Sequence, residues 1–399
     1  MDKLFDNSED CCGCTACMSA CPKQAISMIP DEEGFLYPKI DESLCINCEL
    51  CKNVCAFQRN LVDYDTSRKP LAAFAGVLKD TNILRNSASG GAFISLAFST
   101  LNNNGVVFGC TLNKNKEAEH ICVDKIKDIG KLQGSKYVQS DIKDSFIKVK
   151  QNLKENRQVL FSGTPCQIAG LNSYLKKDYD NLLTVDLICH GVPSPLFFKG
   201  YINWLEDQLK ATIIDFKFRD KKKGWSHTAK IIYKRNNKLH EKIIYPFESY
   251  YYYYFLKGDI YRKSCYVCPY ANSSRVGDIT IGDFWGINNV HPEINDEKGV
   301  SLMLINTKKG LKKIDSIKKY MNLTETDFEQ AKLYNGQLVH PTPKSEKRDM
   351  LYTKFRIEGA STIANEYYKE MKNQIISQKI KSLIPTPIKK MIKKVLKRT

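Results

Sequence analysis

Two copies of one cysteine pattern occur within residues 1–57 and constrain the fold of this chain more than any other feature. Both copies read C-x2-C-x2-C-x3-C, with cysteines at Cys11, Cys14, Cys17, Cys21 and at Cys45, Cys48, Cys51, Cys55. In this pattern three cysteines of a loop bind one cubane, and the fourth reaches across to another cluster. We therefore predict a ferredoxin-like domain with two [4Fe–4S] clusters, bound by Cys11, Cys14, Cys17, Cys55 and by Cys45, Cys48, Cys51, Cys21.

Zinc is the alternative metal for this segment. Structural zinc usually takes two separated C-x2-C pairs, and the third cysteine of each copy has no use in that scheme. Cys12 does not fit the register and is not expected to be a ligand. Ala56 stands where the second copy would usually have proline, which shapes the turn but binds no metal. Apolar residues alternate around an Asp-Glu-Glu-Gly turn in residues 25–41, which predicts a short hairpin between the copies.

The compartment follows from the rest of the composition. The chain has 399 residues, and no apolar run approaches the roughly 20 residues of a membrane span. Its N-terminus has no apolar signal-peptide core, so we expect a cytoplasmic protein. Nine of its 15 cysteines fall between Cys11 and Cys55. In a reducing compartment such short spacings indicate metal rather than disulfides.

The body of the chain alternates apolar runs with helical stretches. Strand patterns occur at residues 71–78, 105–112, 158–163, 182–189, 212–218, 229–234, 278–284 and 301–307, and helical patterns at 93–103, 168–177 and 196–210. This alternation predicts an α/β (α+β) protein whose mixed sheet is flanked by helices. We expect a ferredoxin-like domain at 1–57, a linker at 58–70, an α/β domain at 71–350 and a helical basic tail at 351–399.

Two junctions between a strand and a helix carry candidate chemistry. At the first, Ser87, Ser89, Gly90 and Gly91 precede a helix, and such small residues let backbone N–H groups approach a flavin or nucleotide phosphate. An ordinary helix cap explains the same residues equally well. At the second, Pro165 suits the first turn of a helix. Cys166 then lies near the N-terminus of that helix, where a thiol pKa is lowered and the sulfur suits a ligand or a nucleophile.

Four further cysteines can form a set of their own. Cys166 and Cys189 each follow an apolar strand, and Cys265 and Cys268 form a C-x2-C pair before proline. A third cluster or a zinc ion would suit these four ligands. The remaining two, Cys110 and Cys122, lie inside apolar strands, where core packing is expected.

Several other residues have two interpretations each. His190, which follows Cys189, is a weak catalytic candidate as a proton donor, although a lone loop histidine is more often structural; His227 has the same ambiguity. Lys136 and Tyr137 would suit a phosphate or a substrate carbonyl, or simply the surface. The aromatic run at residues 250–254 would either stack on a ring or form a buried helix face.

Seven segments together resemble the coenzyme F420 (deazaflavin) hydrogenase/dehydrogenase beta-subunit family, here with a fused two-cluster ferredoxin domain. They are SASGGAF (87–93), GSKYVQS (134–140), GTPCQIAGL (163–171), DLICHGVPSP (186–195), FRDKKKGWS (218–226), SCYVCPYA (264–271) and GDITIGDFWG (277–286). The resemblance implies FAD in the α/β domain, with contacts carried over to Ser87, Ser89, Gly90, Gly91, Ser135 and Lys136. It also implies a [4Fe–4S] cluster held by Cys166, Cys189, Cys265 and Cys268.

The resemblance further implies an oxidoreductase that passes electrons between the clusters, the flavin and an unidentified small-molecule substrate. A redox partner protein, either a ferredoxin-type carrier or another subunit, would supply or accept the electrons. The alternative is a non-catalytic electron-transfer subunit of a larger hydrogenase- or dehydrogenase-type complex. Similar chains often occur beside polysaccharide-assembly genes, which suggests a link to that process.

The C-terminus accounts for much of the positive charge. Residues 379–399 contain eight basic residues and no acidic one, against a net charge of +17 for the whole chain. A nucleic-acid partner is not expected, because the charge is gathered in a tail rather than along a folded face. In residues 388–399 apolar residues recur at helical spacing opposite lysines, which predicts a basic amphipathic helix. Such a helix would either contact the inner face of the membrane or pack as an ordinary terminal helix.

Overall fold

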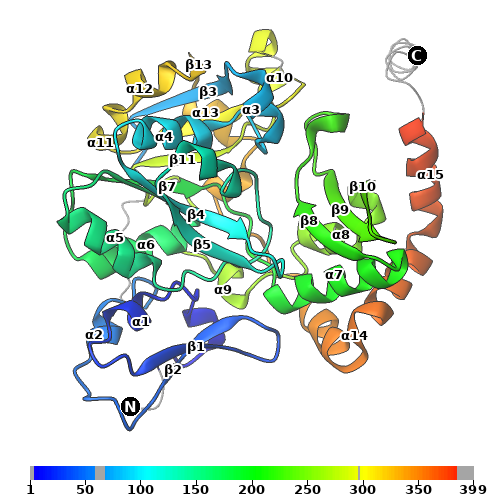
Figure 1. Ribbon diagram of the computed structural model, residues 1–399, viewed down its shortest axis with the longest axis horizontal. Helices are drawn as coiled ribbons and strands as arrows, with labels where there is room; N and C mark the ends of the chain where they lie inside the picture. The colour runs from blue at the N-terminus through cyan, green and yellow to red at the C-terminus, as the bar shows by residue number, and fades with distance from the viewer. Residues whose placement is uncertain (1–3, 59–67, 295–296, 384–399) are drawn as a thin grey trace.

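A computed structural model describes residues 4–58, 68–294 and 297–383 of the chain (Figure 1). Most of the expected linker and the expected amphipathic helix at 388–399 lie outside these residues. In the described part no helix is both long enough and apolar enough to span a bilayer.

The N-terminal segment contains two short helices and the predicted hairpin. Helix α1 (Ala16–Ala20) and helix α2 (Leu50–Asn53) each follow a cysteine-rich loop. Strands β1 (Ile26–Pro30) and β2 (Leu36–Ile40) pair in antiparallel fashion, which confirms the hairpin. The two helices pack on each other, and α1 also packs on helix α6 (Pro165–Leu175) of the body.

The body is built on one mixed sheet of eight strands in the order β13-β3-β12-β11-β7-β6-β4-β5. Their bounds are β3 Ala72–Leu78, β4 Val106–Leu112, β5 Ala118–Val123, β6 Val159–Gly163, β7 Leu182–Leu187, β11 Ile279–Asp283, β12 Ser301–Ile305 and β13 Met321–Glu325. Strands β4, β6, β7 and β11 run parallel to one another, and the other neighbours are antiparallel. All four parallel strands therefore end at the same edge of the sheet.

Helices cover both faces of this sheet. One face packs against α4 (Ala92–Leu101) and α12 (Ile314–Lys318) through a core that includes Met303 and Leu160. The other packs against α5 (Ser145–Lys154) and α6 (Pro165–Leu175), and further along against α10 (Ile287–Val290) and α13 (Phe328–Lys332). Two short helices, α3 (Thr81–Asn86) and α11 (Lys308–Leu311), lie in connections. The fold class predicted from the sequence is thus confirmed.

A second layer stands beside the sheet, at the right in Figure 1. Strands β8 (Thr212–Lys217), β9 (Ala229–Arg235) and β10 (Lys238–Ile244) form a three-stranded antiparallel sheet. It shares an aromatic core with α7 (Pro195–Leu209), α8 (Tyr250–Lys257) and α14 (Arg348–Glu370). Tyr250, Tyr251 and Tyr252 are fully buried there, so the tyrosine run forms a buried helix face. Helix α9 (Lys263–Tyr266) leads back toward the N-terminal domain.

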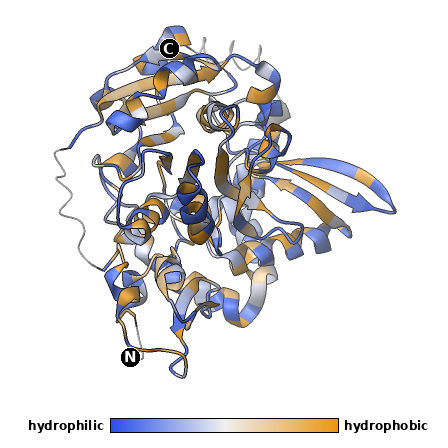
Figure 2. Ribbon diagram, turned by 60° about the vertical axis from the view of Figure 1, so that its left-hand side comes forward, coloured by the Kyte–Doolittle hydropathy of each residue, from blue (hydrophilic) through white to orange (hydrophobic). Residues whose placement is uncertain are grey.

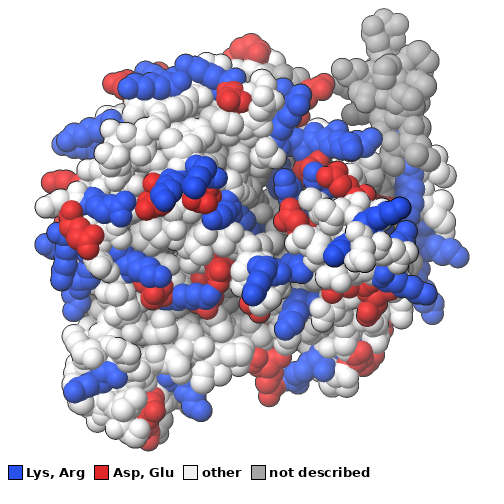
Figure 3. Space-filling model, in the orientation of Figure 1, with Lys and Arg blue, Asp and Glu red and all other residues white. Residues whose placement is uncertain are grey.

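The C-terminal region is helical, but its first part is packed rather than a free tail. Leu351, Tyr352 and Phe355 of α14 are buried in the aromatic core. Helix α15 (Lys372–Leu383) then continues along the edge of the second layer (Figure 1). Hydrophobic residues gather on the inner strands and helices (Figure 2). On the face drawn in Figure 3, Lys and Arg are interspersed with Asp and Glu.

All eight predicted strands and all three predicted helices are present, with ends that differ by a few residues. The prediction missed β5, β10 and β13. Polar residues interrupt β5 and β10, and β13 is a short edge strand whose residues are half exposed. Cys122 lies in a strand as expected, although in β5, which the list of predicted strands lacked; the residue is exposed, so its assignment to the core was wrong.

Candidate functional site

The eight cysteines of the N-terminal domain line two small hollows. Cys21 lies with the second group, in a hollow also lined by Cys45, Cys48 and Cys51. Cys55 lies with the first group, in a hollow lined by Cys11, Cys14 and Cys17 and also by Cys12 and Cys51. Each group thus exchanges its last cysteine with the other, which is the arrangement the doubled motif predicts for two cubanes. Sulfur atoms and apolar side chains around each hollow suit an iron–sulfur cluster.

The sheet explains how two of the body cysteines meet. Strands β6 and β7 are adjacent and parallel, so the residues that follow them lie side by side. Cys166 is in the first turn of α6, directly after β6, and Pro165 occupies the first helical position as predicted. Cys189 follows β7 after one intervening residue.

A buried arginine brings the C-x2-C pair to the same place. The Arg275 guanidinium donates to the carbonyl of Tyr270 at 2.8 Å and to that of Leu187 at 2.9 Å, and it pairs with the buried Asp186 at 3.4 Å. These contacts fix the loop after Cys268 against the end of β7, next to Cys189. Cys265 precedes this loop, within α9.

Electrostatics show that these four sulfurs are neighbours in a buried space. Burial raises the pKa of Cys189 to about 12, and the adjacent Cys166 and Cys268 add to the shift. Burial, Cys189 and Cys268 likewise raise the pKa of Cys265. In the described residues, no three His, Cys, Asp or Glu side chains converge on a point that would hold a single metal ion.

Cys12 occupies a position that the sequence did not reveal. Its half-buried thiol is within hydrogen-bond reach of both Cys14 and Cys166. That hydrogen bond holds the pKa of Cys166 below its usual value. Cys12 therefore lies between a cysteine of the first N-terminal set and a cysteine of the body set. The two sets are direct neighbours across the interface between the N-terminal domain and the body.

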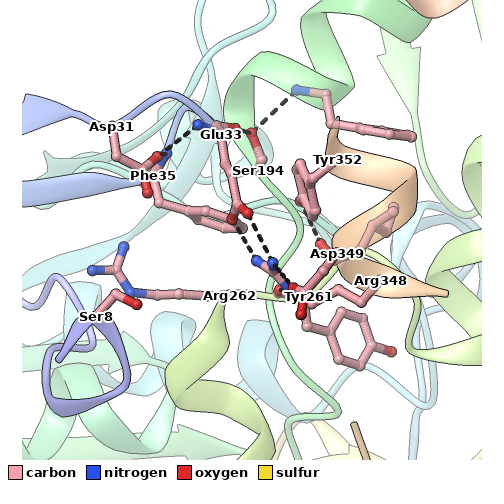
Figure 4. Close-up of polar contacts among 12 residues, drawn as sticks. Ser8, Asp31, Glu33, Phe35, Ser194, Tyr261, Arg262, Arg348, Asp349 and Tyr352 are labelled. Carbon is pink, nitrogen blue, oxygen red and sulfur yellow. Dashed lines mark hydrogen bonds and ion pairs between the residues drawn. The ribbon is translucent and has the colours of Figure 1, made fainter. Parts of the chain in front are cut away.

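An ion pair fixes the N-terminal domain to the body at a second point. Glu33, in the turn between β1 and β2, accepts hydrogen bonds from Arg348 of α14 at 2.8 and 2.5 Å (Figure 4). Arg348 is fully buried, and it also donates to the carbonyl of Tyr261 at 3.0 Å. In the same contact the Ser194 hydroxyl donates to the Glu33 carbonyl. The hairpin is thus held by α7, α14 and the segment before α9.

A cavity of about 330 Å³ opens at the edge where the four parallel strands end. Ligands bind at this edge in many α/β proteins, and the volume is within the range of small-molecule sites. Residues from the ends of β4, β6, β7 and β11 line it, as do five of the six expected flavin contacts: Ser87, Ser89, Gly91, Ser135 and Lys136. Cys189 and His190 line it as well. The body cysteines therefore adjoin the cavity.

Gly90 is the expected contact that does not line the cavity. A Cβ atom at this position would lie 2.0 Å from the Gly76 carbonyl oxygen and 2.5 Å from the Ser301 nitrogen. The loop approaches β3 and β12 so closely that only glycine fits at this position. Packing of the protein alone therefore explains Gly90, and no ligand contact is needed to explain it. Gly91 has a φ of 88° at the N-cap of α4, which also favours glycine.

Lys136 is half-buried at the cavity wall. Its ammonium group donates to the carbonyls of Gln133 at 3.0 Å and Gly134 at 3.2 Å. Burial lowers the pKa of Lys136 to about 8. The carbonyls of this loop thus hold the Lys136 ammonium group at the cavity. This group loses its charge under mildly alkaline conditions. Cys110 also lines the cavity, so its side chain is not simply core packing.

Polar and aromatic side chains form one wall of the cavity. Asp283, at the end of β11, pairs with the buried Arg219 at 2.9 Å and accepts from the Trp225 indole at 2.7 Å. The Trp225 and Trp285 rings are stacked with centroids 4.9 Å apart. His227 lies over Trp285, and burial followed by Arg219 lowers the pKa of this histidine to about 4.

His190 faces the same wall, where burial lowers its pKa while Asp283 opposes the shift. His120, which is buried, contacts the Ser162 carbonyl at 3.0 Å and the Ser140 hydroxyl at 3.1 Å. Both histidines are therefore neutral at pH 7, and they can donate or accept a hydrogen bond but do not supply charge.

The sequence prediction assigned no role to several residues of this wall. Arg219, Trp225, Asp283 and Trp285 lie within two of the seven segments that carried the family resemblance, so the signal was present without a role attached. His120 lies in β5, which the prediction missed, and the sequence carried no signal for it.

Comparisons with known proteins bear on both parts of the chain. Residues 10–58 match the model of the 4Fe-4S dicluster domain, and residues 156–331 match the model of the C terminus of the coenzyme F420 hydrogenase/dehydrogenase beta subunit. No curated protein matches the chain significantly. Among solved structures, a chain of the F420-reducing [NiFe] hydrogenase complex from Methanosarcina barkeri aligns with a TM-score of 0.43 and 15% identity, covering 77% of this chain and 94% of that one.

The dicluster domain supports iron–sulfur clusters and a role in electron transfer. Its bounds coincide with the segment that contains both hollows. The second match contains all four body cysteines and both wall segments. The chain thus joins a segment that matches the 4Fe-4S dicluster domain to a segment that matches the C terminus of coenzyme F420 hydrogenase/dehydrogenase beta subunits.

Proposed function

We propose that the chain is an iron–sulfur flavoprotein oxidoreductase that passes electrons between two ferredoxin-type clusters, a third cluster and a flavin. The observation that carries this proposal is the position of Cys189, which belongs to the body cysteine set and also lines the cavity. A cluster held there would adjoin whatever the cavity binds. On its other side the same set is next to Cys12 and the first N-terminal set.

FAD is the proposed occupant of the cavity. The Ser87–Gly91 loop leads into the N-terminus of α4, where backbone N–H groups favour a phosphate. Lys136 supplies a positive charge to the same cavity. The wall of neutral histidines, Asp283 and Trp285 then faces the remaining space, which is the proposed place for a substrate beside the flavin.

The second N-terminal cluster is the proposed site of electron entry or exit. Cys48 is exposed, and the apolar side chains of Leu44 and Ile46 beside it are 50% and 56% exposed. A cluster at this place would be accessible to a ferredoxin-type carrier or to another subunit of a complex. The proposed link to polysaccharide assembly and a membrane contact through residues 388–399 concern the substrate side and are independent of this route.

Cofactor quantitation tests the proposal directly. Full-length protein purified without oxygen should contain about 12 irons, which corresponds to three cubanes, together with one flavin. The variant Cys265→Ser should retain about 8 irons, whereas the matched control Cys12→Ser should retain them all because Cys12 is not a proposed ligand. Zinc in place of iron in the wild type would overturn the cluster assignment.

Turnover distinguishes an enzyme from a non-catalytic subunit. If the protein that contains its iron–sulfur clusters binds no flavin at micromolar concentration, the chain lacks the proposed reaction centre. If it binds flavin but oxidises its own reduced clusters only when another subunit is added, the electron-transfer alternative is correct.

A further inference from the structure

Four arginine side chains in the described part of the chain are less than a tenth exposed. Three of them have a carboxylate partner: Arg219 with Asp283, Arg275 with Asp186 and Arg348 with Glu33. Arg262 is fully buried, yet no carboxylate among residues 4–58, 68–294 and 297–383 forms an ion pair with it. An isolated buried cation is strongly unfavourable unless a negative charge compensates it.

The contacts of Arg262 are with neutral groups. Its Nε donates to the Cys11 carbonyl at 2.8 Å and its Nη1 to the Gln139 amide oxygen at 3.3 Å. The guanidinium lies 3.9 Å from the centroid of the Tyr37 ring. Its Nη2 is buried and has no hydrogen-bond partner among the described residues. These contacts offset only part of the cost of burying the charge.

The nearby Asp31 does not supply the missing charge. Its carboxylate accepts hydrogen bonds from the backbone of Glu33 and Phe35 within its own turn. Figure 4 shows Arg262 extending past the Glu33–Arg348 pair toward the loop that contains Ser8. The side chain thus reaches the loop of the first N-terminal cysteine set.

The backbone of Arg262 belongs to the body set. Arg262 is the N-cap of α9, and its carbonyl accepts a hydrogen bond from the Cys265 N–H at 2.9 Å. One residue therefore contacts the cysteine loops of both sets, at the interface where Cys12 bridges Cys14 and Cys166. A buried cation at this junction is positioned for an anion on each side.

We propose that Arg262 is the shared counter-ion of the first N-terminal cluster and the body cluster, and that it sets their reduction potentials. This inference rests on the proposed cluster assignment. A cubane with four thiolate ligands is an anion, and reduction by one electron adds a further negative charge to it. The guanidinium stabilises the reduced form more than the oxidised form. It therefore makes both clusters easier to reduce and keeps the electron path between them open.

Redox titration of the anaerobic holoprotein, followed by electron paramagnetic resonance with dithionite as reductant, tests this role. Arg262→Gln should lower the reduction equilibrium constant of these two clusters at least tenfold, which is about 59 mV for a one-electron couple. The cluster of Cys21, Cys45, Cys48 and Cys51 should not change. Arg262→Lys, which keeps the charge, should shift the two potentials less than Arg262→Gln.

Arg348→Gln is the matched control, because it removes a buried cation of the same interface that has its own carboxylate. This control should leave the reduction equilibrium constant of each of the three clusters within twofold of its wild-type value. The proposal is overturned if Arg262→Gln retains its iron and its potentials do not change, or if the control shifts them equally. Wild-type protein without iron would instead overturn the cluster assignment, and iron content reports this separately.

A variant that loses its clusters still gives an answer. In cluster-free full-length protein the wild-type Arg262 has no counter-ion, so Arg262→Met should raise the urea midpoint relative to the wild type. A lower midpoint would show that the neutral contacts of Arg262 suffice to stabilise it, and the counter-ion role would be rejected.

Discussion

Removing the negative charge of Glu33 should loosen the contact between the N-terminal hairpin and the body. In Glu33→Gln the fully buried Arg348 retains, among the described residues, only Asp349 as a charged partner, and the Asp349 side chain is 57% exposed. Breaking a buried ion pair costs about 3–5 kcal/mol. Because the Glu33 side chain is 19% exposed and glutamine keeps one acceptor, we expect a loss of about 2–3 kcal/mol.

The neighbouring residue provides the control. Glu32 pairs with Arg356 of α14 on the surface, with side chains 75% and 46% exposed. Exposed pairs of this kind contribute about 0–1 kcal/mol, so Glu32→Gln should hardly change stability. Both substitutions remove one negative charge from the same turn and differ only in burial.

Urea unfolding of the anaerobic holoprotein measures the difference, and hydrogen exchange locates it. Amides of residues 26–40 should exchange faster in Glu33→Gln than in Glu32→Gln, while the amides of the central strands remain protected. Equal destabilisation by the two variants, or unchanged exchange of the hairpin in Glu33→Gln, would refute the view that this pair anchors the domain.

Three further outcomes follow from buried groups. Burial lowers the pKa of His120 to about 4, below the value of about 6.5 for an unfolded histidine. The free energy of unfolding should therefore be highest above pH 6.5 and fall by about 1.4 kcal/mol per pH unit between pH 6 and 4. His120→Gln should reduce that slope in urea titrations. Lys136 loses its charge as pH rises through about 8, so FAD affinity measured by fluorescence should weaken from pH 7 to pH 9 in the wild type but not in Lys136→Met. Gly90→Ala brings a Cβ within 2.0 Å of the Gly76 carbonyl oxygen, so it should lower the thermal midpoint of the body whether or not flavin is present.

The sequence predicted those parts of the fold that depend on local pattern. The apolar runs of β6 and β7 identify buried parallel strands, and the polar residues Glu119 and His120 conceal β5. The cysteine spacing likewise predicted that Cys21 lies with the second copy of the motif and Cys55 with the first. It could do so because in this motif the fourth cysteine reaches across to the other cluster.

The remainder of the site depends on contacts between distant segments. Asp283 and Arg219 meet only because β11 and the segment after β8 are brought together across the two layers. Cys12 was set aside because it falls outside the register, and its place beside Cys166 is a property of domain docking. No local pattern records such a contact.

The anchor between Glu33 and Arg348 joins positions 315 residues apart in the chain. During synthesis the hairpin emerges from the ribosome long before α14, so the N-terminal domain has no partner for this contact on the nascent chain. Its cysteines are then open to the machinery that delivers iron and sulfide. Helix α14 can therefore anchor the hairpin only after these cysteines have emerged and can bind their clusters.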